Sequence, residues 1–358
     1  MRALVFHGPW EMTVEDRPEP VPGPGDALLE IVATGICGSD LHGYTGENGR
    51  RHPGQVMGHE TVGRVLHDRT GAHRPGTLVT VNPVIGCGGC AACAAGTPQR
   101  CPDRRVIGVG REISAAFAER MAAPARNLVP LPEGVPADIG GLVEPLAVGH
   151  HAVRRAALRP QDRVYVVGGG PIGQAVALAA RRAGNPGVVV GELDPARRAL
   201  LTRLGFTAID PAGPSAAAVS SPVAPSATED PAIPPAGGVV AALGGAADVV
   251  IDAVGSARTL QAAFEVSALG ARVVLVGMAA PRVEISAYAV STEERTVIGS
   301  FAYGEAEFRD TAAWAGAHAA ELEPLIEGRV GLEQAPGTFR ALADGTLKAS
   351  KVLVHPSG

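Results

Sequence analysis

Every cysteine of the chain lies in a pattern that suits a metal ligand. Four of them have the spacing C-x2-C-x2-C-x7-C, namely Cys87, Cys90, Cys93 and Cys101. Four thiolates at this spacing can close a tetrahedron around one Zn²⁺ ion. Because sulfur then fills every position, no water can be activated there, and the pattern predicts a structural zinc site.

A second set of candidate ligands is spread more widely. The fifth cysteine, Cys37, lies in the run Gly-Ile-Cys-Gly-Ser-Asp-Leu-His. His59 follows it by 22 residues, with Glu60 next, and Glu144 stands before a proline. One thiolate, one imidazole and a carboxylate make an open zinc site, which keeps a position for water or substrate. A closed site and an open site in one chain predict an enzyme with one structural and one catalytic zinc ion.

A glycine-rich turn predicts a dinucleotide site. Gly168-Gly169-Gly170-Pro171-Ile172-Gly173 follows an apolar strand and opens a helix, which is the context that G-x-G-x-x-G requires. Gly168 permits a tight turn, Gly170 lets the backbone approach a pyrophosphate, and Gly173 lets helix and strand pack closely. The helix begins at Pro171, which has no N–H, and the free N–H groups of its first turn, from Ile172 onward, favour the anion.

The choice between NAD and NADP depends on the end of the next strand. Glu192 lies there, 19 residues after Gly173. An acidic side chain at this place accepts hydrogen bonds from ribose hydroxyls and repels a 2′-phosphate, so we expect NAD rather than NADP. Arg197 and Arg198 are near enough in sequence to weaken that preference.

Composition excludes several classes of protein. The chain has 358 residues, a length that is enough for two globular domains. Its hydrophobic fraction of 46% is that of an ordinary globular protein. A net charge of -5 gives the chain no excess of positive charge with which to attract nucleic acid or an anionic membrane. No apolar run reaches the roughly 18 residues of a membrane span. The N-terminus is typical of a strand rather than a signal peptide, so we expect a cytoplasmic protein with metal-bound cysteines; in a secreted chain the same four cysteines could form two disulfides.

Two kinds of structure must position these residues. Residues 1–150 contain short apolar runs between Pro and Gly, as in a compact barrel with long loops: Ala27–Ala33, Thr61–Leu66 and Thr77–Asn82. From residue 151, strands alternate with helices, which predicts a parallel, doubly wound sheet. The expected strands are Arg163–Gly168, Val188–Leu193, Ala247–Ala253, Ala271–Gly277 and Arg295–Phe301, and the expected helices are Pro171–Ala183, Pro195–Leu204, Ala257–Ser267 and Ala306–Ala319. A last strand, Lys351–Val354, is expected to return to the first domain.

Residues 211–235 interrupt this pattern. Seven prolines fall there among Ala and Ser. Such a composition buries little apolar surface, and we expect a mobile surface excursion between two strands of the sheet.

Taken together, these motifs resemble the zinc-containing medium-chain dehydrogenase/reductase family, whose members include alcohol, sorbitol, threonine and butanediol dehydrogenases. The resemblance covers nearly the whole chain. It implies a GroES-like catalytic domain and a Rossmann NAD-binding domain, with the active site in the cleft between them. The implied boundaries are 1–151 for the catalytic domain with a zinc lobe at 86–102, 152–300 for the Rossmann domain with an excursion at 211–236, and 301–358 for the return to the catalytic domain.

The resemblance also implies roles for individual residues. Cys37 and His59 are expected to bind the catalytic zinc ion, and either Glu60 or Glu144 is the third ligand. Asp40 is expected to orient His59. Ser39 is expected to contact the substrate hydroxyl and pass its proton toward the cofactor ribose, and His42 to take that proton on to solvent. Cofactor contacts are expected from Val254, Val276, Gly277 and Phe301, the last beside the nicotinamide.

Two departures from the family pattern bear on the substrate. Ala115–Arg120 replaces the usual Gly-Gly-Phe-Ala-Glu-Tyr, which alters a local turn. Ala302 stands where sorbitol dehydrogenases have a polyol-binding arginine, which speaks against sorbitol itself, while Tyr303 is still expected to reach substrate. The His150-His151 pair is expected on a linking helix as packing residues, and Arg50-Arg51-His52 in an exposed loop.

The sequence therefore predicts an NAD-dependent zinc dehydrogenase of a secondary alcohol, such as a polyol, diol or cyclitol, acting as a homodimer or homotetramer on a small molecule. The alternative on the same scaffold is a threonine-type amino-alcohol dehydrogenase or a ketone/aldehyde reductase. A different class is a non-catalytic NAD-binding scaffold or sensor, which would need a broken catalytic zinc site.

Overall fold

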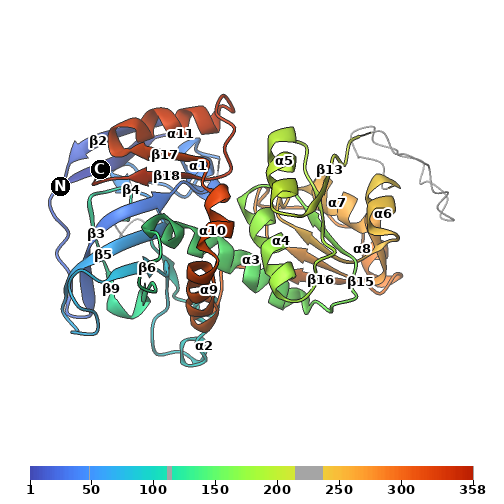
Figure 1. Cartoon of the computed structure of the whole chain (residues 1–358), viewed down its shortest axis with the longest axis horizontal. Coiled ribbons are helices and arrows are strands. Elements are labelled where there is room, and N and C mark those ends of the chain that lie inside the picture. Colours follow the sequence, from blue (N-terminus) through green and yellow to red (C-terminus); the bar gives the residue numbers. More distant parts are fainter. Residues whose placement is uncertain (48, 111–114, 214–236, 358) are drawn as a thin grey trace. The chain divides into compact units, whose positions relative to one another are not determined.

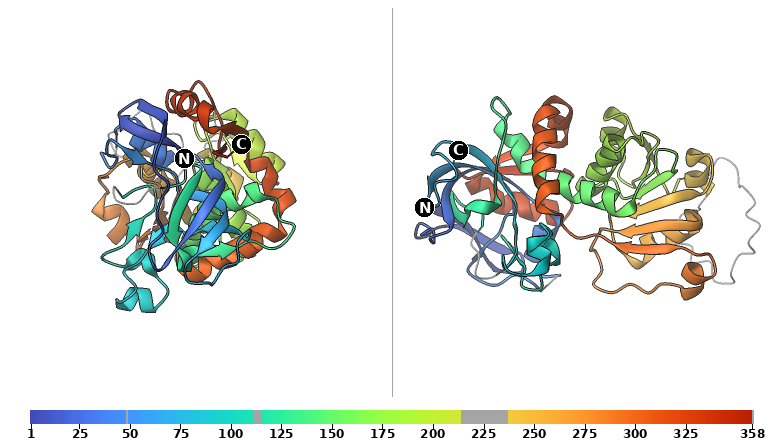
Figure 2. Two further views of the ribbon diagram at one scale, coloured as in Figure 1. Left: turned by 90° about the vertical axis from the view of Figure 1, so that its left-hand side faces the viewer. Right: turned by 90° about the horizontal axis from the view of Figure 1, so that it is seen from below.

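The computed structural model describes residues 1–47, 49–110, 115–213 and 237–357. Its contacts form two compact units (Figure 1). The split unit comprises Met1–Ala147 and Ala302–Gly358, and the continuous unit comprises Val148–Phe301. Both chain ends belong to the split unit (Figure 2). Most of the expected excursion at 211–236 lies outside the described residues.

The split unit is built around strand β3 (Asp26–Gly35). Its residues alternate between buried and half-buried, as expected for a strand with one face on a core. A sheet runs in the order β10-β6-β5-β3-β18-β17, with β9 also pairing with β3. The other strands of this sheet are β5 (Glu60–Asp68), β6 (Leu78–Val81), β9 (Arg120–Pro124), β10 (Leu128–Pro130), β17 (Gly328–Gly331) and β18 (Val352–His355).

The C-terminal part of the chain pairs with this sheet. Strand β18 pairs antiparallel with β3, and Leu353 lies opposite Gly35. A smaller sheet has the order β2-β1-β4, and β7 pairs with β8. Their bounds are β1 (Arg2–Gly8), β2 (Glu11–Asp16), β4 (Gln55–Val56), β7 (Val84–Ile85) and β8 (Arg105–Val106).

Short helices close the split unit. Phe117 lies edge-on against Phe339, which in turn meets Tyr44, so an aromatic cluster ties the helix α11 to α1. The helices are α1 (Gly38–Tyr44), α2 (Ala91–Ala94), α9 (Glu305–Ala317), α10 (Ala319–Leu322) and α11 (Ala335–Ala343). Single 3-10 turns lie at η1 (Pro98–Arg100), η2 (Ala125–Asn127), η3 (Ala137–Leu142), η4 (Glu323–Leu325) and η5 (Leu332–Gln334).

The continuous unit is a six-stranded parallel sheet in the order β13-β12-β11-β14-β15-β16. Helices α4 and α5 cover one face, and α6 and α7 lie on the other (Figure 1). The predicted doubly wound α/β fold is thus confirmed. The strands are β11 (Val164–Val167), β12 (Val189–Gly191), β13 (Thr207–Ile209), β14 (Ala247–Asp252), β15 (Ser267–Leu275) and β16 (Thr296–Gly299). The helices are α3 (Val143–Ala156), which begins in the split unit, α4 (Pro171–Arg182), α5 (Pro195–Arg203), α6 (Gly237–Leu243), α7 (Ala257–Val266) and α8 (Ala287–Ser291).

A few elements differ from the expectation. The edge strand β13 was not predicted, because three residues give too short a run to show a period. The helix expected at 306–319 divides into α9 and α10 at His318, whose φ and ψ of -116° and 23° leave the helical region. In the described part of the chain, no helix is both long enough and apolar enough to cross a membrane.

Candidate active site

Cys37 lies in the turn between β3 and α1. It is the N-cap residue of the helix, and its backbone N–H donates to Asp40 Oδ2 at 3.2 Å. This bond fixes the Asp40 side chain relative to the helix start. Gly35, which ends the strand, has no room for a side chain, because a Cβ there would lie 2.0 Å from Glu60 Oε2. The small residue before the turn therefore leaves space for the carboxylate of a neighbouring strand.

His59 and Glu60 lie where the chain enters β5. The preceding Gly58 has φ +102°, and a Cβ on it would lie 2.9 Å from the backbone nitrogen of Phe117. Both features require glycine. Strand β5 pairs with β3 so that Glu60 stands opposite Gly35, which brings two segments together at one end of the sheet.

Three of the candidate ligands converge. Ligand atoms of Cys37, His59 and Glu60 all lie within 4.8 Å of one another. His59 and Glu60 are buried and Cys37 is half-buried. Sulfur, imidazole nitrogen and carboxylate oxygen are the donors that Zn²⁺ takes in catalytic sites, so these residues fit the ion. The same structure does not bring Glu144 into this group.

The electrostatics of His59 are set by a buried carboxylate. Its Nδ1 lies 3.5 Å from Asp40 Oδ1, which is an ion-pair distance, and makes no hydrogen bond. Its Nε2 is thereby left for a metal. Burial lowers the pKa of His59, but the charges of Asp40 and Cys37 outweigh it and raise the pKa well above its ordinary value. Binding a cation there must displace that proton.

Glu60 has a partner that the sequence did not reveal. Lys351 Nζ donates to Glu60 Oε1 at 2.7 Å, to the other carboxylate oxygen, and to the carbonyl of Ile36 at 3.2 Å. The lysine is 3% exposed. Burial lowers the pKa of Lys351, but the charges of Glu60 and Cys37 outweigh burial, so the pKa lies above its ordinary value and the ammonium stays charged. A rare lysine directly before a buried strand was the available signal, since the chain has only two lysines.

Glu144 lies in the first turn of α3 and has a separate partner. Tyr303 donates its hydroxyl to Glu144 Oε1 at 3.0 Å. Burial raises the pKa of Glu144 to about 7, against the opposing charge of His59. Tyr303 itself is fully buried, so its hydroxyl is directed to this carboxylate and not to open solvent.

The residues expected to move protons lie on α1. Ser39 is half-buried in the first turn. His42 lies one turn further and its side chain is 45% exposed, with Nδ1 2.6 Å from Glu47 Oε2. An imidazole held at Nδ1 keeps Nε2 as the free nitrogen, which suits a proton acceptor.

The Arg50-Arg51-His52 run corrects one expectation. We expected an exposed loop, and Arg50 and His52 are exposed. Arg51 is instead buried, with its guanidinium directed inward toward Asp40 Oδ1 at 3.3 Å. The exposed-loop interpretation was therefore wrong for Arg51. The sequence offered no period from which its burial could be inferred.

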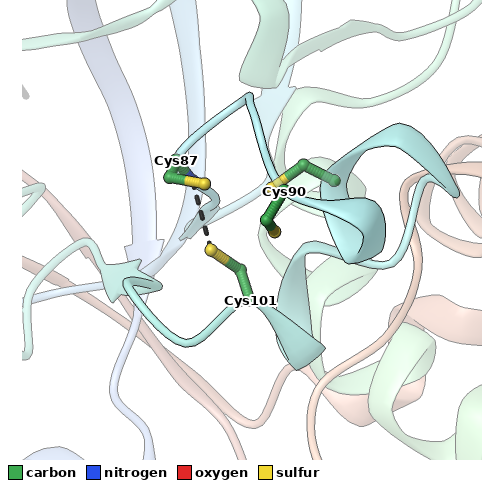
Figure 3. Close-up of side chains that lie close together, drawn as sticks. Cys87, Cys90 and Cys101 are labelled. Carbon is green, nitrogen blue, oxygen red and sulfur yellow. Dashed lines mark hydrogen bonds between the residues drawn. The ribbon is translucent and has the colours of Figure 1, made fainter.

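The four-cysteine lobe has its ligand atoms gathered in the same way. All four sulfurs lie within 4.8 Å of one another, and Cys87, Cys90 and Cys101 are drawn in Figure 3. The cysteines are free rather than paired as disulfides. Backbone N–H groups of Cys87 and Gly88 donate to the sulfurs of Cys101 and Cys93 at 3.3 and 3.4 Å. Such donors favour thiolates, and the set fits a tetrahedral Zn²⁺ ion.

The glycine turn of the continuous unit has the geometry that a dinucleotide needs. Gly168 has φ +91°, and a Cβ on Gly173 would lie 1.8 Å from the carbonyl oxygen of Gly168. At Gly170 the nearest atom to a Cβ would be Arg197 Nη1 at 3.8 Å, so the backbone is open there. Gly170 is also the N-cap of α4 and offers no side-chain cap. The first N–H groups of the helix are thus left for an anion.

Glu192 follows β12 and faces this turn. Its Oε2 accepts a hydrogen bond from the N–H of Gly169, and its Oε1 from that of Asp194, both at 2.8 Å. Arg197 Nη1 lies 4.0 Å from Oε2. Arg198 donates to the carbonyls of Glu192 and Leu193 at 2.6 and 2.7 Å, so its guanidinium holds the backbone of this corner.

The other expected cofactor contacts lie past the carboxyl ends of neighbouring strands. Val254 follows β14 and Val276-Gly277 follows β15. The two segments touch so closely that a Cβ on Gly277 would lie 2.1 Å from the backbone of Val254. Phe301, after β16, is 40% exposed. Ligands bind at these strand ends in open α/β sheets. The His150-His151 pair lies on α3, where His151 is buried.

Comparisons with known proteins agree with this architecture. The alcohol dehydrogenase GroES-like domain matches residues 23–133, and the zinc-binding dehydrogenase family matches residues 171–317. L-galactonate-5-dehydrogenase of Escherichia coli K12 is 33% identical over 304 residues, which cover 84% of this chain and 83% of that protein. The 2-dehydro-3-deoxy-L-galactonate 5-dehydrogenase of Pseudoalteromonas atlantica is 30% identical over 337 residues, covering 93% and 92%.

The solved structures give the same result. A zinc-binding dehydrogenase from Sinorhizobium meliloti 1021, bound to NADP, superposes with a TM-score of 0.83 at 30% identity, covering 99% of each chain. The predicted resemblance and the predicted dehydrogenase activity are thereby confirmed. The chain belongs to the zinc-containing medium-chain dehydrogenase/reductase family and is a dehydrogenase that acts on a secondary alcohol.

Proposed function

We propose that this dehydrogenase prefers NAD and oxidises one secondary hydroxyl of a polyhydroxylated substrate, a polyol or sugar acid, to the ketone. The observation that carries the proposal is the convergence of Cys37 and His59 with the carboxylate of Glu60, with no second thiolate in this cluster among the described residues. Two relatives of at least 30% identity that cover more than 80% of this chain, both sugar-acid dehydrogenases by name, support the substrate class. L-threonine 3-dehydrogenases of 34% identity match only 58% of the chain.

The split unit is proposed to hold one structural and one catalytic zinc ion. Cys37 Sγ, His59 Nε2 and a Glu60 oxygen are the proposed catalytic ligands, since one ligand atom from each of these residues already converges with the others. When bound, the ion polarises the oxygen of an alcohol or ketone. Lys351 holds the Glu60 carboxylate by both oxygens, so it opposes rotation of that ligand out of the site. Glu144, held by Tyr303, is proposed as a nearby carboxylate that is not a permanent ligand.

Protons are proposed to leave along α1. Ser39 Oγ accepts the proton of the substrate hydroxyl as it gives up its own, and His42 Nε2 passes a proton on to solvent. Glu47 supports this role because it occupies Nδ1 of His42 and so leaves Nε2 unprotonated in the neutral ring. The relay gives the reaction a route for the proton that accompanies hydride loss.

The continuous unit is proposed to bind the cofactor. The N–H groups at Gly170 and the start of α4 hold the pyrophosphate, and Glu192 discriminates against a 2′-phosphate by charge. Arg197, 4.0 Å from that carboxylate, moderates the discrimination. Replacing Glu192 with Ala is expected to shift the ratio of kcat/KM for NAD over NADP toward NADP by about 10-fold, or ~1.4 kcal/mol. An unchanged ratio in this variant would contradict the assignment.

The protein is further proposed to be cytoplasmic and to form a homodimer or homotetramer, as members of this family do. Light scattering after size-exclusion chromatography measures the second point directly. A monomer at micromolar concentration would contradict it.

The deciding experiment is NADH formation across a panel of aldonic acids, alditols, cyclitols, diols and L-threonine, with zinc content measured on the same sample. Turnover of an aldonic acid or polyol with about two zinc ions per chain supports the proposal. Turnover of L-threonine alone would favour the amino-alcohol alternative. One zinc ion per chain and no turnover would contradict the proposal.

A further inference from the structure

A buried arginine lies beside the proposed catalytic ligands without belonging to them. The side chain of Arg51 is 2% exposed and that of Asp40 is fully buried. Arg51 Nη2 donates to Asp40 Oδ1 and to the carbonyl of Ser39, each at 3.3 Å, and Nε lies 3.0 Å from Met57 Sδ. A guanidinium removed from water is costly unless its partners are held in place, so this contact calls for a physical reason.

The partner of Arg51 is shared with two proposed zinc ligands. Asp40 Oδ1 faces both Arg51 and His59 Nδ1, the latter at 3.5 Å. Asp40 Oδ2 accepts the backbone N–H of Cys37 at 3.2 Å. One carboxylate therefore joins the arginine to the imidazole and to the backbone of the thiolate residue.

The first helix is shaped around this arginine. A Cβ on Gly43 of α1 would lie 2.6 Å from Arg51 Cγ, so glycine is needed where the side chain passes. The arginine thus contacts α1 at three levels: the Gly43 backbone, the Ser39 carbonyl and the Asp40 carboxylate. These contacts fix the orientation of the helix start that carries Cys37.

We propose that Arg51 is a positioning residue for the catalytic zinc site. It holds the Asp40 carboxylate and the Ser39 carbonyl in place, and these in turn hold Cys37 and the imidazole of His59 in the orientation that directs Nε2 to the metal. Its guanidinium faces the same Asp40 oxygen that faces His59 Nδ1, so the two side chains share one fixed carboxylate. The inference rests on the proposed function only in assuming that Cys37, His59 and a carboxylate bind zinc.

A purely structural brace makes a different prediction. A brace would lower the unfolding temperature when removed, but would leave zinc affinity and the absorption spectrum of a bound metal unchanged in the folded protein. A positioning residue changes both. Partners of metal ligands in other proteins are worth about 10- to 100-fold in metal affinity or activity when mutated.

The experiment compares wild type with Arg51→Met, which keeps most of the apolar stem, and with Arg51→Lys, which keeps the charge but has one nitrogen in place of Nη2 and Nε. Arg163→Met is the matched control, because Arg163 pairs with Asp248 through Nε and Nη2 in the continuous unit. The catalytic zinc dissociation constant is measured by chelator competition, together with the cobalt-substituted spectrum, kcat/KM and thermal unfolding.

Arg51→Met is expected to weaken zinc binding at the catalytic site by about 10- to 100-fold and to alter the cobalt spectrum, while the zinc ion of the lobe stays bound. Arg51→Lys is expected to keep part of the wild-type zinc affinity at the catalytic site. The control Arg163→Met is expected to keep all of it. A folded Arg51→Met with wild-type zinc affinity and spectrum overturns the inference. If Arg51→Met does not fold, wild-type values in Arg51→Lys overturn it. A wild-type protein that binds zinc only in the lobe overturns the proposed function instead.

Discussion

The two proposed zinc sites are built in opposite ways. In the lobe, all four ligands lie between Cys87 and Cys101, and local backbone N–H groups support the sulfurs. In the other site, buried charges support the ligands. Asp40 lies beside Cys37 and His59, and Lys351, 291 residues along the chain from Glu60, holds the Glu60 carboxylate. A structural site needs its own ligands and little else, whereas a site that must keep an open position depends on a wider set of fixed charges.

The largest expected effect tests whether the two sites are independent. Cys37→Ser removes the thiolate from the open site and is expected to lower kcat/KM by more than about 100-fold, beyond the range typical of partners of metal ligands. Zinc analysis should show one ion lost and the lobe ion retained. Loss of both ions would mean that the sites are coupled and would break the comparison.

The two glutamates sharpen the description of the open site. Glu60→Gln is expected to lower catalytic zinc affinity and kcat/KM by about 10- to 100-fold, because it weakens a proposed ligand and leaves Lys351 without its carboxylate. Glu144→Gln keeps a hydrogen-bond acceptor for Tyr303 and is expected to retain the ion. The reverse order of zinc affinity in the two variants would make Glu144 the third ligand.

Lys351 tests the role of distant charge. Lys351→Met is expected to lower kcat/KM by about 10-fold, because the Glu60 carboxylate is then buried without a cation. Lys351→Arg, which keeps the charge, is the control and should lose less. Equal loss in both variants would show that shape, rather than charge, is what Glu60 requires.

The smallest expected effect on catalysis comes from the lobe. Cys90→Ser is expected to release the structural ion and lower the thermal unfolding midpoint, since the binding energy of a structural zinc ion contributes to folding. The kcat of the protein that remains folded should change by less than about 3-fold, measured below the unfolding transition against an untreated wild-type sample. A large loss of kcat in Cys90→Ser with an unchanged melting curve would contradict the structural role of the lobe zinc ion.

Features built from residues close together in the chain could be predicted from the sequence, and features built from distant segments could not. The cysteine lobe and the glycine turn are local patterns whose residues lie close together in the chain, so their spacing alone defines them. The family resemblance extended this to Cys37, His59 and the two glutamates. The parallel sheet was predicted from the alternation of strands and helices, but the three-residue edge strand β13 was not.

The remaining features depend on tertiary register. Lys351 meets Glu60 only because β18 and β5 both flank β3, a pairing that no local pattern encodes. Arg51 has no apolar neighbours at a helical or strand period, and its burial depends on where Asp40 places its carboxylate. Tyr303 was assigned to substrate from its family position, yet its hydroxyl is directed to Glu144.

The split of one unit by the other has a consequence for synthesis. Strand β3 emerges from the ribosome early, but its neighbour β18 and the Glu60 partner Lys351 follow only after the whole continuous unit has been made. At about 5–20 residues per second, the nascent chain spends some tens of seconds with Glu60 and β3 unpaired on that side. The continuous unit can fold during that interval, whereas the proposed zinc binding at Cys37 and His59 is expected to await the last segment. Ribosome-bound chains arrested before residue 350 should therefore acquire the lobe ion without the other.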